Sequence, residues 1–243
     1  APRSYDPPQT SALIRNFAGN PCGDGRVTLE YALQVSCNTP FAKLGVEEVK
    51  ADGIKEKARQ FGFETEDLSV PLKVSPSRLG LIADPPAVAQ SSIGQRDVRM
   101  TPLQGAMIAA AVANDGALMQ PYLVKEIQAP DYSTLKTTSP KTLSEPLTSD
   151  QAGQLQQMMV AVVEKGTGTE AQVRNATVGG KTGTAEDGDA RQDHEWFIGF
   201  AIVDGEAVAA VAVVLENAGT SSSQAASVAG DIMTSVISQR VRK

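Results

Sequence analysis

Lys181-Thr182-Gly183-Thr184 follows Val178-Gly179-Gly180, and an apolar run from Trp196 to Val203 comes soon after. Asp204-Gly205 separates that run from a second one, Val208 to Leu215. Two apolar runs joined by Asp-Gly are typical of a β-hairpin, so the lysine segment is predicted to lie on a strand beside it. A cation, a hydroxyl and a glycine on such a strand suit a ligand with a carboxylate and a carbonyl, because glycine lets another backbone approach and lysine supplies charge.

Further segments stand in one order around the lysine motif. They are Ser36-Cys37-Asn38, Ser92-Ile93-Gly94-Gln95, Met100-Thr101-Pro102-Leu103-Gln104, Asn114-Asp115-Gly116, Gly166-Thr167-Gly168-Thr169 and, after the motif, His194 to Phe200. This ordered set resembles the transpeptidase domain of penicillin-binding proteins, especially the class B type, from about Val27 to Asn217. The resemblance implies an α+β fold with an antiparallel sheet flanked by helices, similar to that of serine β-lactamases and present here only in part.

The resemblance also implies an activity, that of a peptidoglycan D,D-transpeptidase. Such an enzyme cross-links stem peptides through an acyl-serine intermediate and is acylated by β-lactams. Ser36 would relay a proton toward the leaving nitrogen, Asn38 would bind the substrate's backbone amide, and Lys181 would maintain the electrostatic field and the proton path. The plainer alternatives are a helix-end hydroxyl bonded locally for Ser36 and a helix cap for Asn38.

The three residues after the lysine would bind the substrate. Thr182, with Thr184, would hold the terminal carboxylate, and Gly183 would leave room for the substrate to lie along the strand. The backbone amide of Thr184 would be one oxyanion donor. No cofactor and no metal is implied.

The nucleophilic Ser-x-x-Lys motif that the family places before Ser36 is absent. Ser133-Thr134-Leu135-Lys136 has the spacing, but it follows Ser36, and Thr137 to Pro140 cannot continue a buried helix. We interpret it as a chance match in an exposed loop or hairpin. We therefore expect residues 1–243 to be the C-terminal portion of a single transpeptidase domain. The nucleophile helix and first strands would lie upstream of residue 1, and this chain alone would be inactive.

Two other functions stay open. A serine β-lactamase relative would need a deacylating base, and no segment is assigned to that role. A non-catalytic domain that keeps the fold as a binding module or scaffold is the other alternative.

Composition bounds the partners and the location. The chain has 243 residues and a net charge of −6, which argues against nucleic acid as a partner. No apolar run approaches the roughly 20 residues that span a membrane. If the resemblance holds, the protein sits on the extracytoplasmic face of the bacterial membrane, anchored by an upstream segment. Expected partners are stem peptides, β-lactams, that upstream segment and a glycosyltransferase.

Several residues remain with more than one interpretation. Cys22 and Cys37 either form a disulfide or are unrelated thiols. The resemblance places His194, the single histidine, at the start of a strand, which implies an orienting or core role. The acidic set Asp187, Asp189, Asp193 and Glu195 fits no cation loop and is predicted to be a solvated turn.

Helices are expected from Thr28 to about Val35, around 54–61, from Pro102 to Asn114, from Thr148 to Gly166, and from 221–223 onward. Residues 64–96 show no period and are predicted to be irregular. Residues 121–147 are expected to form a strand pair with Val124, Ile127 and Leu143 inward. The last helix should cover the sheet with one stripe, comprising Ala225, Val228, Ala229, Ile232, Met233, Val236 and Ile237.

Overall fold

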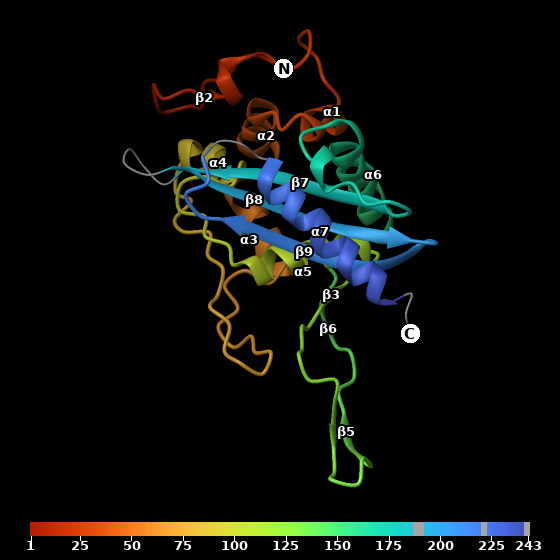
Figure 1. Ribbon diagram of the computed structural model, residues 1–243. Helices are drawn as coiled ribbons and strands as arrows, with labels where there is room; N and C mark the ends of the chain where they lie inside the picture. Colours follow the sequence, from red (N-terminus) through yellow and green to blue (C-terminus); the bar gives the residue numbers. More distant parts are fainter. Residues whose placement is uncertain (187–191, 220–222, 241–243) are drawn as a thin grey trace.

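The computed structural model describes residues 1–186, 192–219 and 223–240. Within them, the centre is an antiparallel sheet with the strand order β7-β8-β9 (Figure 1). Its strands are β7 (Thr177–Ala185), β8 (His194–Val203) and β9 (Glu206–Leu215). Lys181 pairs with Ile198 of β8, which pairs in turn with Ala212 of β9. The predicted hairpin and the strand beside it are both confirmed.

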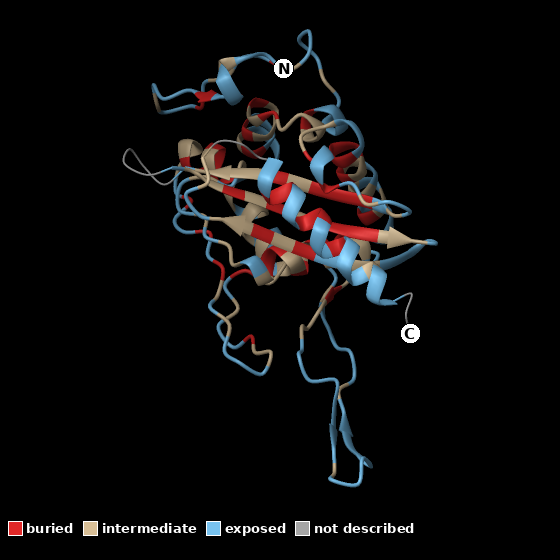
Figure 2. Cartoon of the chain, viewed as in Figure 1, coloured by how far each residue is buried: buried red, intermediate tan, exposed pale blue. Residues whose placement is uncertain are grey.

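Helices cover the two faces of this sheet. Helix α7 (Ser223–Arg240) packs on the face that carries Phe197 and Val211. Helix α5 (Pro102–Ala113) contacts β8 and β9 from the opposite face, because successive strand residues point to opposite sides. The approach is close at Gly105, where a Cβ would lie 2.9 Å from Ile198 Cγ2. Figure 2 shows the resulting line of buried residues along the strands.

The predicted helices form where capping residues begin them. Thr28, Thr101 and Thr148 each accept a hydrogen bond from the backbone N–H three residues on, and Thr148 forms a complete capping box with Gln151. The helices before α7 are α1 (Leu29–Gln34), α2 (Asn38–Leu44), α3 (Lys50–Gln60), α4 (Pro85–Ser91), α5 and α6 (Ser149–Lys165). A short π-helical turn, Gly45–Val49, joins α2 to α3.

One segment predicted to be irregular contains a helix, and the N-terminal residues contain a short strand pair. Residues 64–96 contain α4, which is N-capped by Asp84 and buries Ala87, Val88 and Ala89. It has only 7 residues, too few for a helical period to stand out. Near the N-terminus, β1 (Ser4–Tyr5) pairs with β2 (Ile14–Arg15).

The segment between α5 and α6 projects away from the sheet (Figures 1 and 2). It contains β3 (Leu118–Met119), β4 (Glu126–Gln128), β5 (Thr134–Thr137) and β6 (Thr142–Ser144), with β3 paired to β6 and β4 to β5. The strand pair was predicted, but the burial was wrong. Val124, Ile127 and Leu143 are 43%, 49% and 39% exposed, because the projecting hairpin has no second layer to cover it within the described residues.

The apolar face of α7 is narrower than predicted. On α7, Ala225, Ala229 and Met233 are fully buried, whereas Val228, Ile232 and Val236 remain exposed. The helix touches the sheet along a line of mostly small residues, so the next residues around its axis point outward. On α1, Ala32 is buried but Leu29 is not. No helix in the described ranges is long and apolar enough to cross a bilayer.

Candidate active site

Ser36 lies at the sharp connection between α1 and α2. Its φ of 56° puts it in the left-handed region, which costs energy for a residue with a Cβ. Neighbouring contacts hold it there. The N–H of Cys37 donates to Ala32 O at 2.8 Å, and Cys37 forms a disulfide with Cys22. Of the two interpretations of these cysteines, the structure therefore shows the disulfide.

The Ser36 hydroxyl and the Lys181 amine meet across the fold. Lys181 Nζ lies 2.7 Å from Ser36 Oγ, although the two residues are 145 positions apart in the sequence. The same amine donates to the backbone carbonyl of Thr182 at 2.7 Å. The structure thus brings together two of the predicted catalytic residues, one from the α1–α2 connection and one from β7.

Burial changes the acidity of this lysine. Among the described residues no carboxylate pairs with the amine, and desolvation by burial lowers the pKa of Lys181 from 10.5 to about 8. Near neutral pH the ammonium form still dominates, but a proton can leave it at modest cost. A group with such a pKa, bonded to a serine hydroxyl, is suited to proton transfer.

Thr182 and Thr167 form a second polar contact. Thr182 is 6% exposed, and its Oγ1 lies 2.7 Å from Thr167 Oγ1. Thr167 follows Gly166, where a Cβ would lie 2.3 Å from the carbonyl of Gln34. Thr167 had no predicted role. Its place in Gly166-Thr167-Gly168, directly after a helix end and before the lysine strand, was the available signal.

Thr182 and Thr184 present their carbonyls at the open edge of β7. Lys181 Nζ donates to Thr182 O, and Gln95 Nε2, from the turn after α4, donates to Thr184 O at 3.1 Å. In an antiparallel ladder the N–H and C=O of one residue point to the same side, so the Thr184 N–H also faces this edge. Gly183 lies between them and has Trp196 as its neighbour on β8. The predicted substrate-binding residues therefore lie on one strand, with the backbone groups of Thr182 and Thr184, but not those of Gly183, at its open edge.

Asn38 is placed differently from Ser36. It is the first residue of α2, and its side-chain amide donates to the carbonyl of Arg15 at 3.0 Å. Its backbone N–H donates to Asn16 Oδ1 at 3.1 Å. Asn38 thus lies two residues from Ser36, with its amide engaged toward the N-terminal segment. Its predicted role in binding the substrate amide stays a prediction.

The Ser-x-x-Lys match at Ser133 lies where expected. Ser133 precedes β5 in the projecting hairpin and is exposed, and its Oγ bonds Asp131 Oδ1 at 2.6 Å. Lys136, on β5, is exposed as well. The interpretation of this motif as a chance match in an exposed hairpin is confirmed for its position.

The residues at the start of β8 differ from prediction in one respect. His194 begins the strand as expected, and its Nδ1 accepts the N–H of Asn217 at 3.0 Å. Glu195 was predicted to be solvated, but it is fully buried, and its Oε2 accepts the N–H of Ala225 near the start of α7. A helix N-terminus stabilises a carboxylate, which explains how the acid can be buried there.

Two members of the acidic set, Asp187 and Asp189, lie outside the described residues. Asp193 is half-buried just before β8. Among the described residues, no three carboxylate, histidine or cysteine side chains gather so that they could hold a metal ion.

Nearly the whole chain matches one known protein family. Residues 3–234 match the family described as "Penicillin binding protein transpeptidase domain". The chain belongs to this family. Its fold is the penicillin-binding transpeptidase fold, seen here in part.

Proteins named PbpA are among the most similar relatives. The peptidoglycan D,D-transpeptidase PbpA of Mycolicibacterium smegmatis is 42% identical over 216 residues, which cover 87% of this chain and 43% of that protein. Stage V sporulation protein D of Bacillus subtilis is 31% identical over 230 residues, with 87% of this chain and 34% of that protein covered. The chain thus spans less than half the length of these relatives.

Solved structures of penicillin-binding protein A from Mycobacterium tuberculosis share the fold. One crystal structure superposes with a TM-score of 0.90 at 34% identity, covering 98% of this chain and 55% of that one. The imipenem acyl-enzyme complex of the same protein has a TM-score of 0.89 at 34% identity, covering 98% and 54%.

Proposed function

We propose that these 243 residues are the C-terminal part of a peptidoglycan D,D-transpeptidase domain. A serine in a Ser-x-x-Lys motif upstream of residue 1 attacks the carbonyl of a D-alanyl-D-alanine stem peptide and forms an acyl-serine. The amine of a second stem then resolves this intermediate, completing the cross-link. β-Lactams resemble the dipeptide and acylate the same serine.

The contact between Lys181 Nζ and Ser36 Oγ, at 2.7 Å, is the observation that carries this proposal. When the acyl bond forms, the leaving nitrogen must gain a proton. Lys181, with its pKa lowered to about 8, can give a proton to Ser36 while Ser36 passes its own to the leaving nitrogen. The path runs from Lys181, in the middle of β7, to Ser36 in the α1–α2 connection.

The remaining groups at the β7 edge bind and stabilise the substrate. The hydroxyls of Thr182 and Thr184 hold the terminal carboxylate. The Thr167 hydroxyl is hydrogen-bonded to that of Thr182. The Thr184 N–H faces the open edge, where a backbone amide can stabilise an oxyanion. A peptide laid along this edge would extend the sheet by one strand.

Relatives support the chemistry. PbpA of Mycolicibacterium smegmatis is named a peptidoglycan D,D-transpeptidase, and penicillin-binding protein A of Mycobacterium tuberculosis was crystallised as an imipenem acyl-enzyme. We place the complete protein on the extracytoplasmic face of the cytoplasmic membrane, held by an upstream anchor. The glycosyltransferase partner stays a prediction.

Intact-mass measurement after penicillin treatment tests the proposal. We expect one stable adduct on the complete protein, mapped to a serine upstream of residue 1, and none on residues 1–243 alone. Turnover of a chromogenic cephalosporin without a lasting adduct would favour a β-lactamase relative. A complete protein with neither adduct nor turnover would indicate a non-catalytic domain, and an adduct on Ser133 would overturn the assignment of the nucleophile.

A further inference from the structure

Gln95 makes a contact with the lysine strand that the proposed chemistry does not use. Its side-chain amide, Nε2, donates to the backbone carbonyl of Thr184 at 3.1 Å, across 89 positions of sequence. Thr184 is the last residue but one of β7. The contact therefore fixes the end of this strand from outside the sheet.

The turn that presents Gln95 is tightly folded. Helix α4 ends at Ser91, and the backbone N–H groups of Gly94 and Gln95 donate back to Ser91 O and Gln90 O at 3.1 and 3.0 Å. Gly94 has a φ of 74°, which a residue without a Cβ adopts easily. These hydrogen bonds to the end of α4 therefore fix the position of the Gln95 backbone.

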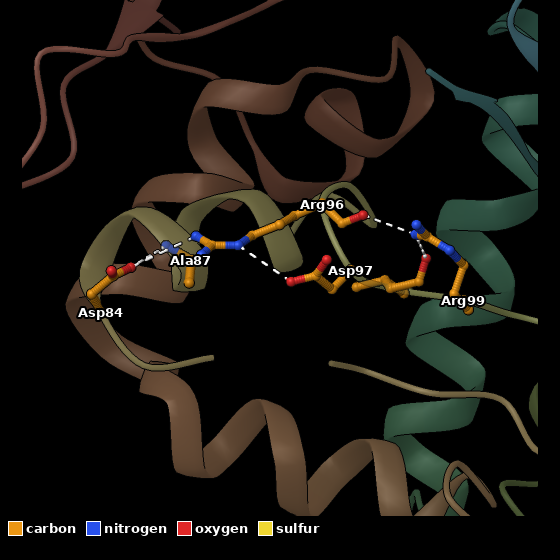
Figure 3. A network of polar contacts seen from close by, with 6 residues as sticks. Asp84, Ala87, Arg96, Asp97 and Arg99 are labelled. Atoms are coloured by element: carbon orange, nitrogen blue, oxygen red, sulfur yellow. Dashed lines mark hydrogen bonds and ion pairs between the residues drawn. The ribbon is translucent and has the colours of Figure 1, made fainter. Parts of the chain in front are cut away.

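Arg96, the next residue, holds the turn from the other side. Its φ of 67° is costly for an arginine, so the surrounding contacts must maintain it. Its Nη1 lies 3.8 Å from Asp84 Oδ1 and its Nε 3.5 Å from Asp97 Oδ2 (Figure 3). Arg99 Nη1 donates to the Arg96 carbonyl at 2.9 Å. The guanidinium of Arg96 therefore ties the turn to both ends of the segment that carries α4.

The same segment is anchored to the rest of the fold. Arg99 pairs with Arg78 through two backbone hydrogen bonds of 2.7 Å, and Thr101 begins α5 directly afterwards. The turn lies between α4 and α5, and its Gln95 side chain makes a hydrogen bond to β7. Because the turn is anchored on both sides, it can act as a rigid support for the end of β7.

We propose that Gln95 is a positioning residue that aligns Thr184 for the transpeptidase reaction, and this inference rests on the proposed function. Holding the Thr184 carbonyl limits rotation of the backbone about Thr184, and so keeps its N–H directed at the open edge. A carbonyl oxygen has two lone pairs, so Gln95 can stay bound while a substrate amide shares the same acceptor. The Asp84–Arg96–Asp97 contacts keep Gln95 in reach.

Hydrogen–deuterium exchange on the complete protein tests the support itself. The variants are Gln95→Ala and the isosteric Gln95→Glu, whose carboxylate cannot donate to a carbonyl. The matched control is Gln90→Ala, five positions earlier, whose side chain makes no hydrogen bond within the described residues. We expect faster exchange in the peptide that contains Thr184 for both Gln95 variants, and no change for Gln90→Ala. Unchanged exchange in the Gln95 variants would overturn the inference, whatever the enzyme's activity.

Penicillin acylation kinetics then test the link to chemistry. An oxyanion donor that is misaligned rather than removed should lower the acylation rate constant about tenfold, less than the loss of the donor itself. The dissociation constant of the preceding complex should change less than twofold, and Gln90→Ala should match the wild type. Faster exchange with an unchanged acylation rate constant would show a purely structural contact and overturn the positioning role. A wild-type protein that is never acylated would refute the proposed function, while the exchange result would still decide whether Gln95 restrains Thr184.

Discussion

The chain contains two serine–lysine pairs in opposite surroundings. Ser36 and Lys181 are 145 residues apart, yet their side chains meet at 2.7 Å, and burial lowers the pKa of Lys181 to about 8. Ser133 and Lys136 have the family spacing of a catalytic motif, but both are exposed on the projecting hairpin, and Ser133 bonds its neighbour Asp131. The two pairs consist of the same residue types, so their different properties come from burial and from the neighbouring groups.

Under the proposed function, desolvation and a fixed partner, rather than spacing in the sequence, distinguish Lys181 as the lysine suited to proton transfer. Water around an exposed ammonium stabilises its charge, so the group is a weak acid and stays almost fully protonated near neutral pH. The buried ammonium loses that water, and the serine hydroxyl is held against it by the α1–α2 connection. The following predictions compare matched changes in the two pairs.

The largest effect is expected from removing the lysines. Lys181→Met in the complete protein should lower the rate of penicillin acylation by about 10³-fold, because both the proton path and the cation beside the carboxylate site are lost. Lys136→Met should leave it within a factor of two. Stopped-flow or mass-spectrometric acylation rates measure both. Equal losses in the two variants would contradict the distinction between the pairs.

The second effect concerns stability against pH. The pKa of Lys181 is about 8 in the folded chain, below its ordinary value of 10.5. Between those values the unfolded chain binds more protons, so the free energy of unfolding should rise with pH, by up to about 3 kcal/mol from this group. Below pH 8 both states are protonated, and the penalty for burying the charge is fully present.

Urea unfolding from pH 7 to 10.5 checks this prediction. Wild type and Lys181→Met are compared, so that other groups titrating in the same range cancel. The stability of the wild type relative to the variant should increase above pH 8. A difference that stays flat or decreases with pH would show that the amine is not desolvated. Lys136→Met serves as the control on the hairpin.

The smallest effect is expected from the threonines. Thr182→Val removes the hydroxyl that bonds Thr167 and is proposed to hold a carboxylate, and should weaken the non-covalent binding of penicillin about tenfold. Thr137→Val, on the exposed strand β5, should have no measurable effect. Competition binding at short times measures the affinity. A Thr182→Val protein with normal affinity would remove this threonine from the carboxylate site.

Much of the fold could be predicted because its signals are local. Asp204-Gly205 between apolar runs specified the hairpin, and the caps at Thr101 and Thr148 specified two helices. Helices α2 and α4 were missed because a seven-residue helix shows little period, and α2 also contains Pro40. Pro40 is tolerated there because it lies in the first turn of the helix, where backbone N–H groups have no partner within the helix.

The candidate site could be predicted only in its parts. Ser36 and the lysine strand were found as separate segments, and the resemblance to the family suggested that they meet. The contacts of Thr167 and Gln95 with β7 could not be predicted, since they depend on how α4 and α6 end relative to the sheet. The prediction of burial also failed where tertiary packing determines which side chains are covered. Glu195 is buried against α7, whereas Val228 and Ile127 face outward.

A double-mutant cycle between Ser36 and Lys181 tests the central claim most directly. Acylation rates of the complete protein are measured for Ser36→Ala, Lys181→Met and the combination. If the two residues form one proton path, the double variant should be no slower than Lys181→Met alone, with a coupling energy of about 2 to 3 kcal/mol. Losses that simply multiply, with no coupling, would show that the 2.7 Å contact plays no part in the reaction.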